Sequence, residues 1–227
     1  MEKESVIGIV GGMGPMAGVL LQKYIYTYDK SERDQGHVKS IAINDTKIPD
    51  RTEYILKKSG DSPLARLIED VYVLTTLKVG VIAIPSNTSM FFIDELRRQT
   101  PIEILDIAEE SVRAAKEKGV AKVLVLTTDG ARETKVYQGR CDKYGIKYVM
   151  PGDENQRIVN DVIRGVVLGT RGNEDRLVEV IRESDCDGVI VGSTELSFVR
   201  DELVYDGVLV DSLKVLAERA VDRAKAV

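Results

Sequence analysis

The 227-residue sequence predicts an α/β protein of two pseudo-symmetric lobes, each a roughly four-stranded parallel sheet flanked by helices. Two short apolar runs, residues 81–85 and 189–192, are rich in β-branched side chains and end in hydroxyl and amide groups, as buried parallel strands do. The alternation of strands and amphipathic helices also occurs twice. Because ligands bind outside the carboxyl ends of parallel strands, we expect one site in the cleft between the lobes.

The first half of the chain predicts four strands. Apolar residues at helical spacing predict helices between them, and Pro15 suits the first turn of the first helix. Residues 48–52 form a loop that leads from the second strand to a helix at the same edge of the sheet. The strands are expected at residues 6–10, 40–44, 81–85 and 102–105.

The second half repeats this pattern, with polar strand ends at equivalent places. We therefore expect an internal duplication that brings Ser86 and Ser193 to opposite sides of one cleft. The expected first lobe comprises residues 1–106 plus 213–227, and the second lobe residues 107–212. Its strands are expected at residues 122–128, 147–150, 189–192 and 208–211.

Composition excludes several classes of protein. A formal net charge of −5 without a basic block argues against nucleic-acid binding, and 43% hydrophobic residues without a long apolar run argue against a membrane span. The first residues lack the pattern of a signal peptide, so we expect a cytoplasmic location. Cys141 and Cys186 lie far apart and His37 is the single histidine, which argues against a zinc site or a Ser-His-Asp triad.

Two features have competing interpretations. The spacing of Gly12, Gly14 and Gly18 resembles a dinucleotide-binding loop, but the third glycine is one place late and no acidic residue ends the second strand. Arg51 is either a solvated loop residue or a clamp for a carboxylate, since guanidinium binds carboxylates in a bidentate manner.

Six motifs, in this order, resemble the aspartate/glutamate racemase family and most closely its aspartate racemase branch. The resemblance covers nearly the whole chain and implies two pseudo-symmetric lobes, a homodimer, and cofactor-independent inversion of the α-carbon of an amino acid, aspartate or glutamate. The motifs are Gly11-Gly12-Met13-Gly14-Pro15, Arg33-Asp34-Gln35, Ile48-Pro49-Asp50-Arg51-Thr52, Pro85-x-Asn87-Thr88, Thr127-Thr128 and Gly192-x-Thr194-Glu195.

The family has a catalytic cysteine at the positions of Ser86 and Ser193. A thiol titrates near pH 8.5, whereas a hydroxyl group is far less acidic and is a poor base without a partner. His37 and Glu195 are the candidate partners, and neither is an evident one. We therefore expect slow racemisation or none. Both thiols were either replaced to trap a bound ligand or lost in a natural paralogue. Met90 stands where many members have histidine and is expected in the core.

The resemblance also implies substrate-binding roles. Asn87, Thr88 and Thr194 would donate to the α-carboxylate, with Thr128 and the Met13 backbone at the rim, unless the threonines only cap helices. Arg51 would bind the distal carboxylate with Arg171, or with Arg164 in place of Arg171, and Glu195 would have a supporting role. Two other functions remain open: binding of an acidic amino acid without catalysis, and a different reaction on a small dicarboxylate.

Overall fold

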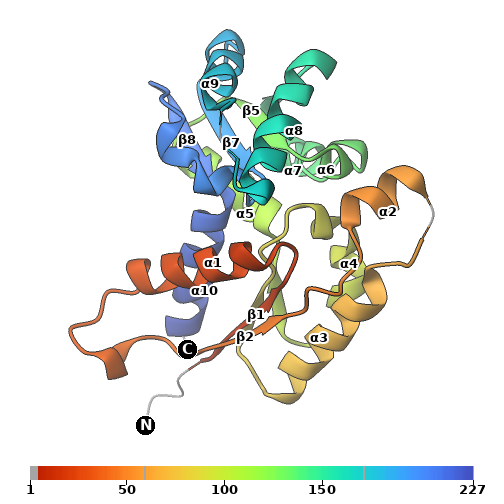
Figure 1. Cartoon of the computed structure of the whole chain (residues 1–227). Helices are drawn as coiled ribbons and strands as arrows, with labels where there is room; N and C mark the ends of the chain where they lie inside the picture. The colour runs from red at the N-terminus through yellow and green to blue at the C-terminus, as the bar shows by residue number, and fades with distance from the viewer. Residues whose placement is uncertain (1–4, 59, 171, 227) are drawn as a thin grey trace.

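A computed structural model describes residues 5–58, 60–170 and 172–226, and these form two lobes joined by a central pair of helices (Figure 1). Each lobe contains a four-stranded parallel sheet, in the order β2-β1-β3-β4 in the first lobe and β6-β5-β7-β8 in the second. The same strand order in both halves confirms the predicted fold class. None of the described helices combines the length and hydropathy needed to cross a membrane.

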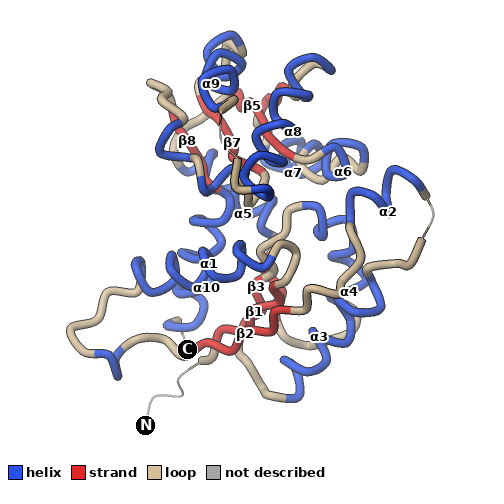
Figure 2. The backbone as a smooth tube through the Cα atoms, viewed as in Figure 1, coloured by secondary structure: helices blue, strands red, loops and turns tan. Residues whose placement is uncertain are grey.

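The first lobe follows the predicted alternation of strands and helices (Figure 2). Strand β1 lies in the middle of the sheet, where Ile7 pairs with Ser40 of β2 and with Val81 of β3. Its elements are β1 (Ile7–Gly11), α1 (Pro15–Tyr28), η1 (Asp34–Gly36), β2 (Ser40–Asn44), α2 (Arg51–Lys57), α3 (Leu64–Thr76), β3 (Val81–Ala83), η2 (Thr88–Phe92), α4 (Ile93–Arg97) and β4 (Glu103–Leu105).

The second lobe repeats this arrangement, with β5 in the middle of the sheet between β6 and β7. Its elements and the final helix are α5 (Ile107–Glu117), β5 (Lys122–Thr127), α6 (Asp129–Glu133), α7 (Gln138–Tyr144), β6 (Lys147–Val149), α8 (Asp153–Leu168), α9 (Glu174–Glu183), β7 (Gly188–Gly192), η3 (Leu196–Phe198), η4 (Arg200–Glu202), β8 (Val208–Asp211) and α10 (Ser212–Lys225).

The core divides according to the period-two alternation of β5. Val123 and Val125 point into the larger core, which also contains the first sheet and buried residues of α5 and α10. Leu124 and Leu126 point the other way and pack with apolar residues of α8 and α9. One face of the second sheet therefore packs toward the junction of the two lobes.

Helices α5 and α10 leave equivalent strand ends and meet at this junction. Asp106 follows β4 and accepts hydrogen bonds from the backbone N–H groups of Ala108 and Glu109, and Asp211, the last residue of β8, caps α10 in the same way. Helix α10 then packs along α1 and α5, so the C-terminus lies near the first sheet (Figure 1).

Strand boundaries agree with the prediction to within two residues, and the second and eighth strands agree residue for residue. Four strands, β3 to β6, are shorter than predicted, and the largest difference is in β3, which ends at Ala83 because the chain turns before Ser86. Arg51, expected in a loop, is the first residue of α2, where Asp50 caps the helix by accepting from the Glu53 N–H at 2.6 Å. Met90 is buried in the core, as predicted.

Candidate active site

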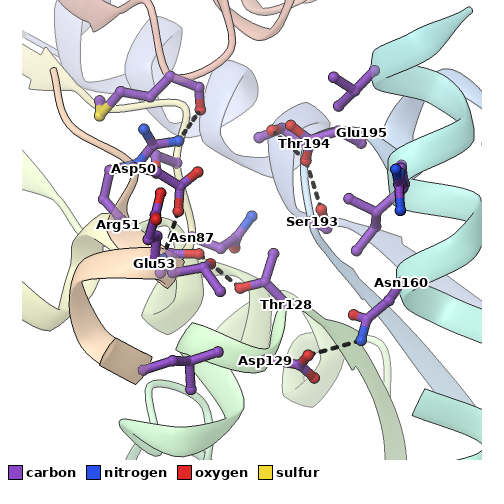
Figure 3. Close-up of a pocket in the computed structure, with 18 of the residues that line it drawn as sticks. Asp50, Arg51, Glu53, Asn87, Thr128, Asp129, Asn160, Ser193, Thr194 and Glu195 are labelled. Carbon is purple, nitrogen blue, oxygen red and sulfur yellow. Dashed lines mark hydrogen bonds between the residues drawn. The ribbon is translucent and has the colours of Figure 1, made fainter. Parts of the chain in front are cut away.

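A cavity of about 980 Å³ lies at the carboxyl ends of both sheets, between the lobes. Its lining brings together nearly all of the predicted site residues. These are Met13, Arg51, Ser86, Asn87, Thr88, Thr128, Ser193, Thr194 and Glu195, with the alternative residue Arg164. Arg171 lies outside the described residues. In Figure 3, Arg51 stands on one wall, and Ser193, Thr194 and Glu195 stand on the wall opposite.

The glycine-rich loop after β1 positions the backbone of Met13. Gly12 has a φ of +100°, and a Cβ built on it would lie 2.3 Å from the carbonyl oxygen of Asp45, so a side chain is excluded at this position. This close approach holds the loop against the end of β2. The carbonyl oxygen of Met13 then accepts a 3.0 Å hydrogen bond from Nη2 of Arg51.

Two backbone carbonyls hold the partly buried guanidinium group of Arg51. Nη2 binds the oxygen of Met13, and Nη1 donates to the oxygen of Pro49 at 3.3 Å. The buried Nε has no hydrogen-bond partner among the described residues. Burial lowers the pKa of the guanidinium group, and the nearby carboxylates of Asp50 and Glu195 oppose this shift. A partly buried cation in the cavity wall fits a carboxylate ligand.

Ser86 ends the first of the two matching strand tips and is 4% exposed. Its Oγ accepts a hydrogen bond from the hydroxyl group of Ser89 at 2.8 Å and another from the Ser89 backbone N–H at 3.3 Å. Ser89 is fully buried, and its hydroxyl group also lies 3.3 Å from the sulfur of Met13. Sequence reasoning missed Ser89, although its position three residues after Ser86 in a polar turn was a usable signal.

Ser193 ends the second tip and is 1% exposed. It has a carboxylate partner, one of the two candidates that the sequence offered: its hydroxyl group donates to Oε2 of Glu195 at 2.7 Å. The same oxygen accepts from the hydroxyl group of Thr194 at 3.2 Å. Glu195 reaches back because its backbone is helical (φ −64°, ψ −40°) rather than extended.

His37 is not a partner for either serine. It lies before the first residue of β2, at the opposite edge of the sheet from the cavity, and its Nδ1 is 3.3 Å from Oδ2 of Asp29. Of the two candidate bases named from the sequence, Glu195 is therefore the one that the fold brings to the site.

Asn87 is fixed at the junction of the lobes. Its Oδ1 accepts a 2.6 Å hydrogen bond from the hydroxyl group of Tyr137, and its Nδ2 donates to Oγ of Ser212 at 3.2 Å. Tyr137 is 1% exposed and also packs against Gly192, so it links the two strand tips. Burial raises the pKa of Tyr137, which keeps its hydroxyl group a donor.

Threonine side chains join the lobes at the floor of the cavity. Oγ1 of Thr88 lies 2.8 Å from Oγ1 of Thr128, and Thr128 also caps α6 by accepting from the Ala131 N–H. The alternative interpretation, that the threonines only cap helices, therefore applies to Thr128, and the side chains of Thr88 and Thr194 cap none of the described helices. Gly130 allows the contact, because a Cβ there would lie 2.9 Å from Cα of Thr52.

One face of α8 forms a wall that sequence reasoning largely missed. Asn160, Ile163, Arg164 and Val167 recur at helical spacing and all line the cavity. Asn160 donates to Oδ2 of Asp129 at 2.8 Å, which ties the helix to the floor of the cavity (Figure 3). The sequence signal for this wall was the presence of Ile163 and Val167, two apolar residues outside the buried stripe of the helix.

Known proteins resemble this chain along nearly its whole length. The broad specificity amino-acid racemase RacX of Bacillus subtilis is 26% identical over 230 residues, which cover 95% of this chain and 96% of that protein. The structure of an aspartate racemase from Picrophilus torridus matches with a TM-score of 0.87 and 27% identity, covering 97% of this chain and 94% of that one. A glutamate racemase from Francisella tularensis shares the fold alone, with a TM-score of 0.70 and 16% identity over 95% of this chain and 79% of that one.

The duplicated α/β lobes, with two matching strand tips facing one cavity, define a two-lobed protein of the racemase fold. The model of the Asp/Glu/hydantoin racemase family matches residues 10–220. This chain belongs to the Asp/Glu/hydantoin racemase family.

Proposed function

We propose that the cavity binds a small acidic amino acid and is the site of a cofactor-independent racemase of the aspartate/glutamate type. Positions 86 and 193 would stand on the two faces of the α-carbon. One would take the α-proton while the other gives a proton to the opposite face, so that charge and protons balance within the pair. The single observation that supports this most is that both strand tips line one cavity with the buried guanidinium group of Arg51.

The substrate carboxylates have separate candidate partners. Thr88, Thr128 and Thr194 offer hydroxyl groups at the tips, close to the positions of the reacting atoms. Arg51 offers its guanidinium group at the cavity wall to the distal carboxylate, and Arg164 on α8 is the second basic residue of the lining. This arrangement supports a dicarboxylic amino acid over a neutral one.

Turnover by the chain with its own residues is expected to be very slow or absent. A serine hydroxyl group is a far weaker acid than a thiol, and a proton-transfer pair works best when its pKa values lie near the operating pH. Glu195 gives Ser193 a proton acceptor, but no carboxylate is hydrogen-bonded to Ser86 among the described residues. The pair is therefore equipped to bind and orient a substrate more than to exchange its proton.

The decisive experiment measures chiral turnover of L-aspartate and L-glutamate by the double variant Ser86→Cys with Ser193→Cys, beside the parent chain. Racemisation by the double variant and not by the parent supports the proposal and identifies the substrate. A folded double variant that binds aspartate but leaves it optically pure contradicts the racemase assignment. That outcome favours an acidic amino-acid binding protein, because the guanidinium group and hydroxyl groups suffice for binding.

We also infer a homodimer, as the family resemblance implies. Tyr72, Val73 and Leu77 are 67%, 44% and 51% exposed at the C-terminal end of α3, which gives an apolar surface outside the core. Light scattering is expected to report twice the chain mass of 25.1 kDa, and Tyr72→Glu is expected to weaken the assembly. A monomer at micromolar concentration contradicts the inference.

A further inference from the structure

The two catalytic positions have opposite hydrogen-bond environments. At position 86 the side-chain oxygen is an acceptor, and both the hydroxyl group and the backbone N–H of Ser89 donate to it. At position 193 the hydroxyl group is a donor, because a carboxylate oxygen of Glu195 can only accept its hydrogen. The pseudo-symmetry of the fold therefore does not extend to the polarity of the site.

The direction of the Ser89 hydrogen bond follows from its alternatives. The Ser89 hydroxyl group has one hydrogen, and its two neighbours are Oγ of Ser86 at 2.8 Å and the sulfur of Met13 at 3.3 Å. A thioether is a weak acceptor, so the hydrogen goes to the oxygen. The backbone N–H of Ser89 points to the same oxygen and cannot reverse its role.

These environments stabilise different protonation states of a thiol. Donors aimed at a sulfur favour its anion, whereas a neighbouring carboxylate disfavours the anion and holds the proton in a hydrogen bond. We propose that position 86 is built to carry the negative charge of the resting pair, that position 193 is built to hold the proton, and that Ser89 is the positioning residue that fixes this order. That positions 86 and 193 form the reacting pair rests on the proposed function. Which of the two positions carries the negative charge can be measured without any substrate.

The test uses two single-thiol variants, Ser86→Cys and Ser193→Cys, at pH 7. Thiolate absorbance near 240 nm and the rate of alkylation by iodoacetamide, located by peptide mass spectrometry, report the anion at each position. The native thiols give a low background, because burial raises the pKa of Cys141 to about 12 and also raises the pKa of Cys186. We expect alkylation in Ser86→Cys to be about tenfold faster than in Ser193→Cys, which corresponds to one pKa unit.

Second-site variants assign the cause. Ser89→Ala in the Ser86→Cys background is expected to remove most of the thiolate absorbance and to slow alkylation about tenfold. Ser184→Ala is the control, because it removes a partly buried hydroxyl group that donates to the carbonyl of Ile181 at the end of α9, outside the cavity lining. Glu195→Gln in the Ser193→Cys background removes the repelling charge and is expected to increase the thiolate signal several-fold.

Equal thiolate signals in the two single-thiol variants, or no effect of Ser89→Ala in a variant with an unchanged circular dichroism spectrum, would overturn the inference. These results are independent of chiral turnover. A double variant that racemises while both thiols are equally protonated supports the proposed function and refutes the order of charge. The opposite combination, an ordered pair without turnover, refutes the racemase assignment alone.

Discussion

The hydroxyl group of Ser193 and the carboxylate of Glu195 form a 2.7 Å hydrogen bond inside the cavity. The two residues are two positions apart, and the turn after β7 brings the carboxylate back toward the strand tip. A proton acceptor therefore stands beside Ser193, and Ser86 has a hydroxyl donor instead.

Glu195→Gln, made in the double variant that carries Ser86→Cys and Ser193→Cys, is expected to lower kcat by about tenfold to a hundredfold, because it removes the anion that holds the proton at position 193. Glu53→Gln is the control, since it removes the same charge from the rim of the same cavity. Rates from circular dichroism of L-aspartate at saturating concentration test this. Equal losses in both variants would show that Glu195 acts only through the net charge of the cavity.

Arg51→Gln is expected to weaken binding of aspartate about a hundredfold, or roughly 2–3 kcal/mol, because a charged hydrogen bond to a desolvated carboxylate is lost. Alanine lacks the distal carboxylate, so its affinity should change little. Titration calorimetry on the parent chain measures both ligands. Arg132→Gln is the control, because Arg132 pairs with Asp153 outside this cavity. A similar loss for alanine would place Arg51 at the α-carboxylate instead.

Gly130→Ala is expected to destabilise the chain by about 1–3 kcal/mol. The added Cβ would lie 2.9 Å from Cα of Thr52 and 3.0 Å from Cγ2 of Thr88, so it forces α6 away from α2. Gly139→Ala is the matched control in α7, where a Cβ meets no atom within 4 Å among the described residues and should stabilise the helix by up to about 1 kcal/mol. Urea unfolding of both variants measures the difference, and similar midpoints would contradict tight inter-lobe packing.

Asp70 predicts a pH dependence of stability. Burial, together with the carboxylates of Asp45 and Glu69, raises its pKa from 3.8 to about 6. The folded chain therefore binds more protons than the unfolded chain between about pH 4 and 6, and this residue lowers stability as the pH rises through that window. Asp70→Asn is expected to remove this contribution and to stabilise the chain by about 1–2 kcal/mol at pH 7. Urea unfolding of the parent chain and of Asp70→Asn from pH 4 to 7 tests this prediction, with the exposed Asp61→Asn as control. Parallel stability profiles of the parent and Asp70→Asn would contradict it.

The sequence was sufficient for the sheets and for most of the cavity lining. A run of β-branched residues predicts a buried strand, and the hydroxyl groups that follow it mark the carboxyl end of that strand. Because ligands bind outside the carboxyl ends of parallel strands, Ser86 and Ser193 could be placed in one cleft. The internal duplication supported the strand assignment of each half, since strands with polar ends were expected at equivalent positions of both halves.

The polar contacts of the tips were predicted only in part. Glu195 was a candidate partner from the sequence, but hydrophobic periodicity does not report the backbone turns that bring Glu195 and Ser89 to the two serines. Ser89 and Glu195 both reach back to a serine from short helical turns, η2 and the residue before η3. The wall formed by α8 was also missed, since its cavity-facing residues Asn160 and Val167 belong to no buried stripe. Asn87 has two hydrogen-bond partners that are distant in sequence: Tyr137 lies 50 residues further along the chain, and Ser212 lies 125 residues further.

Helix α10 follows all eight described strands in the chain, yet its apolar side chains complete the core that contains the first sheet. During translation, the first lobe therefore emerges before the helix that packs along α1, and lacks it until residues 212–225 have left the ribosome. We expect nascent chains that lack α10 to engage chaperones and to be sensitive to protease in both lobes. A stop codon shortly before Ser212 should thus abolish folding of both lobes, although α10 directly follows the last strand of the second lobe.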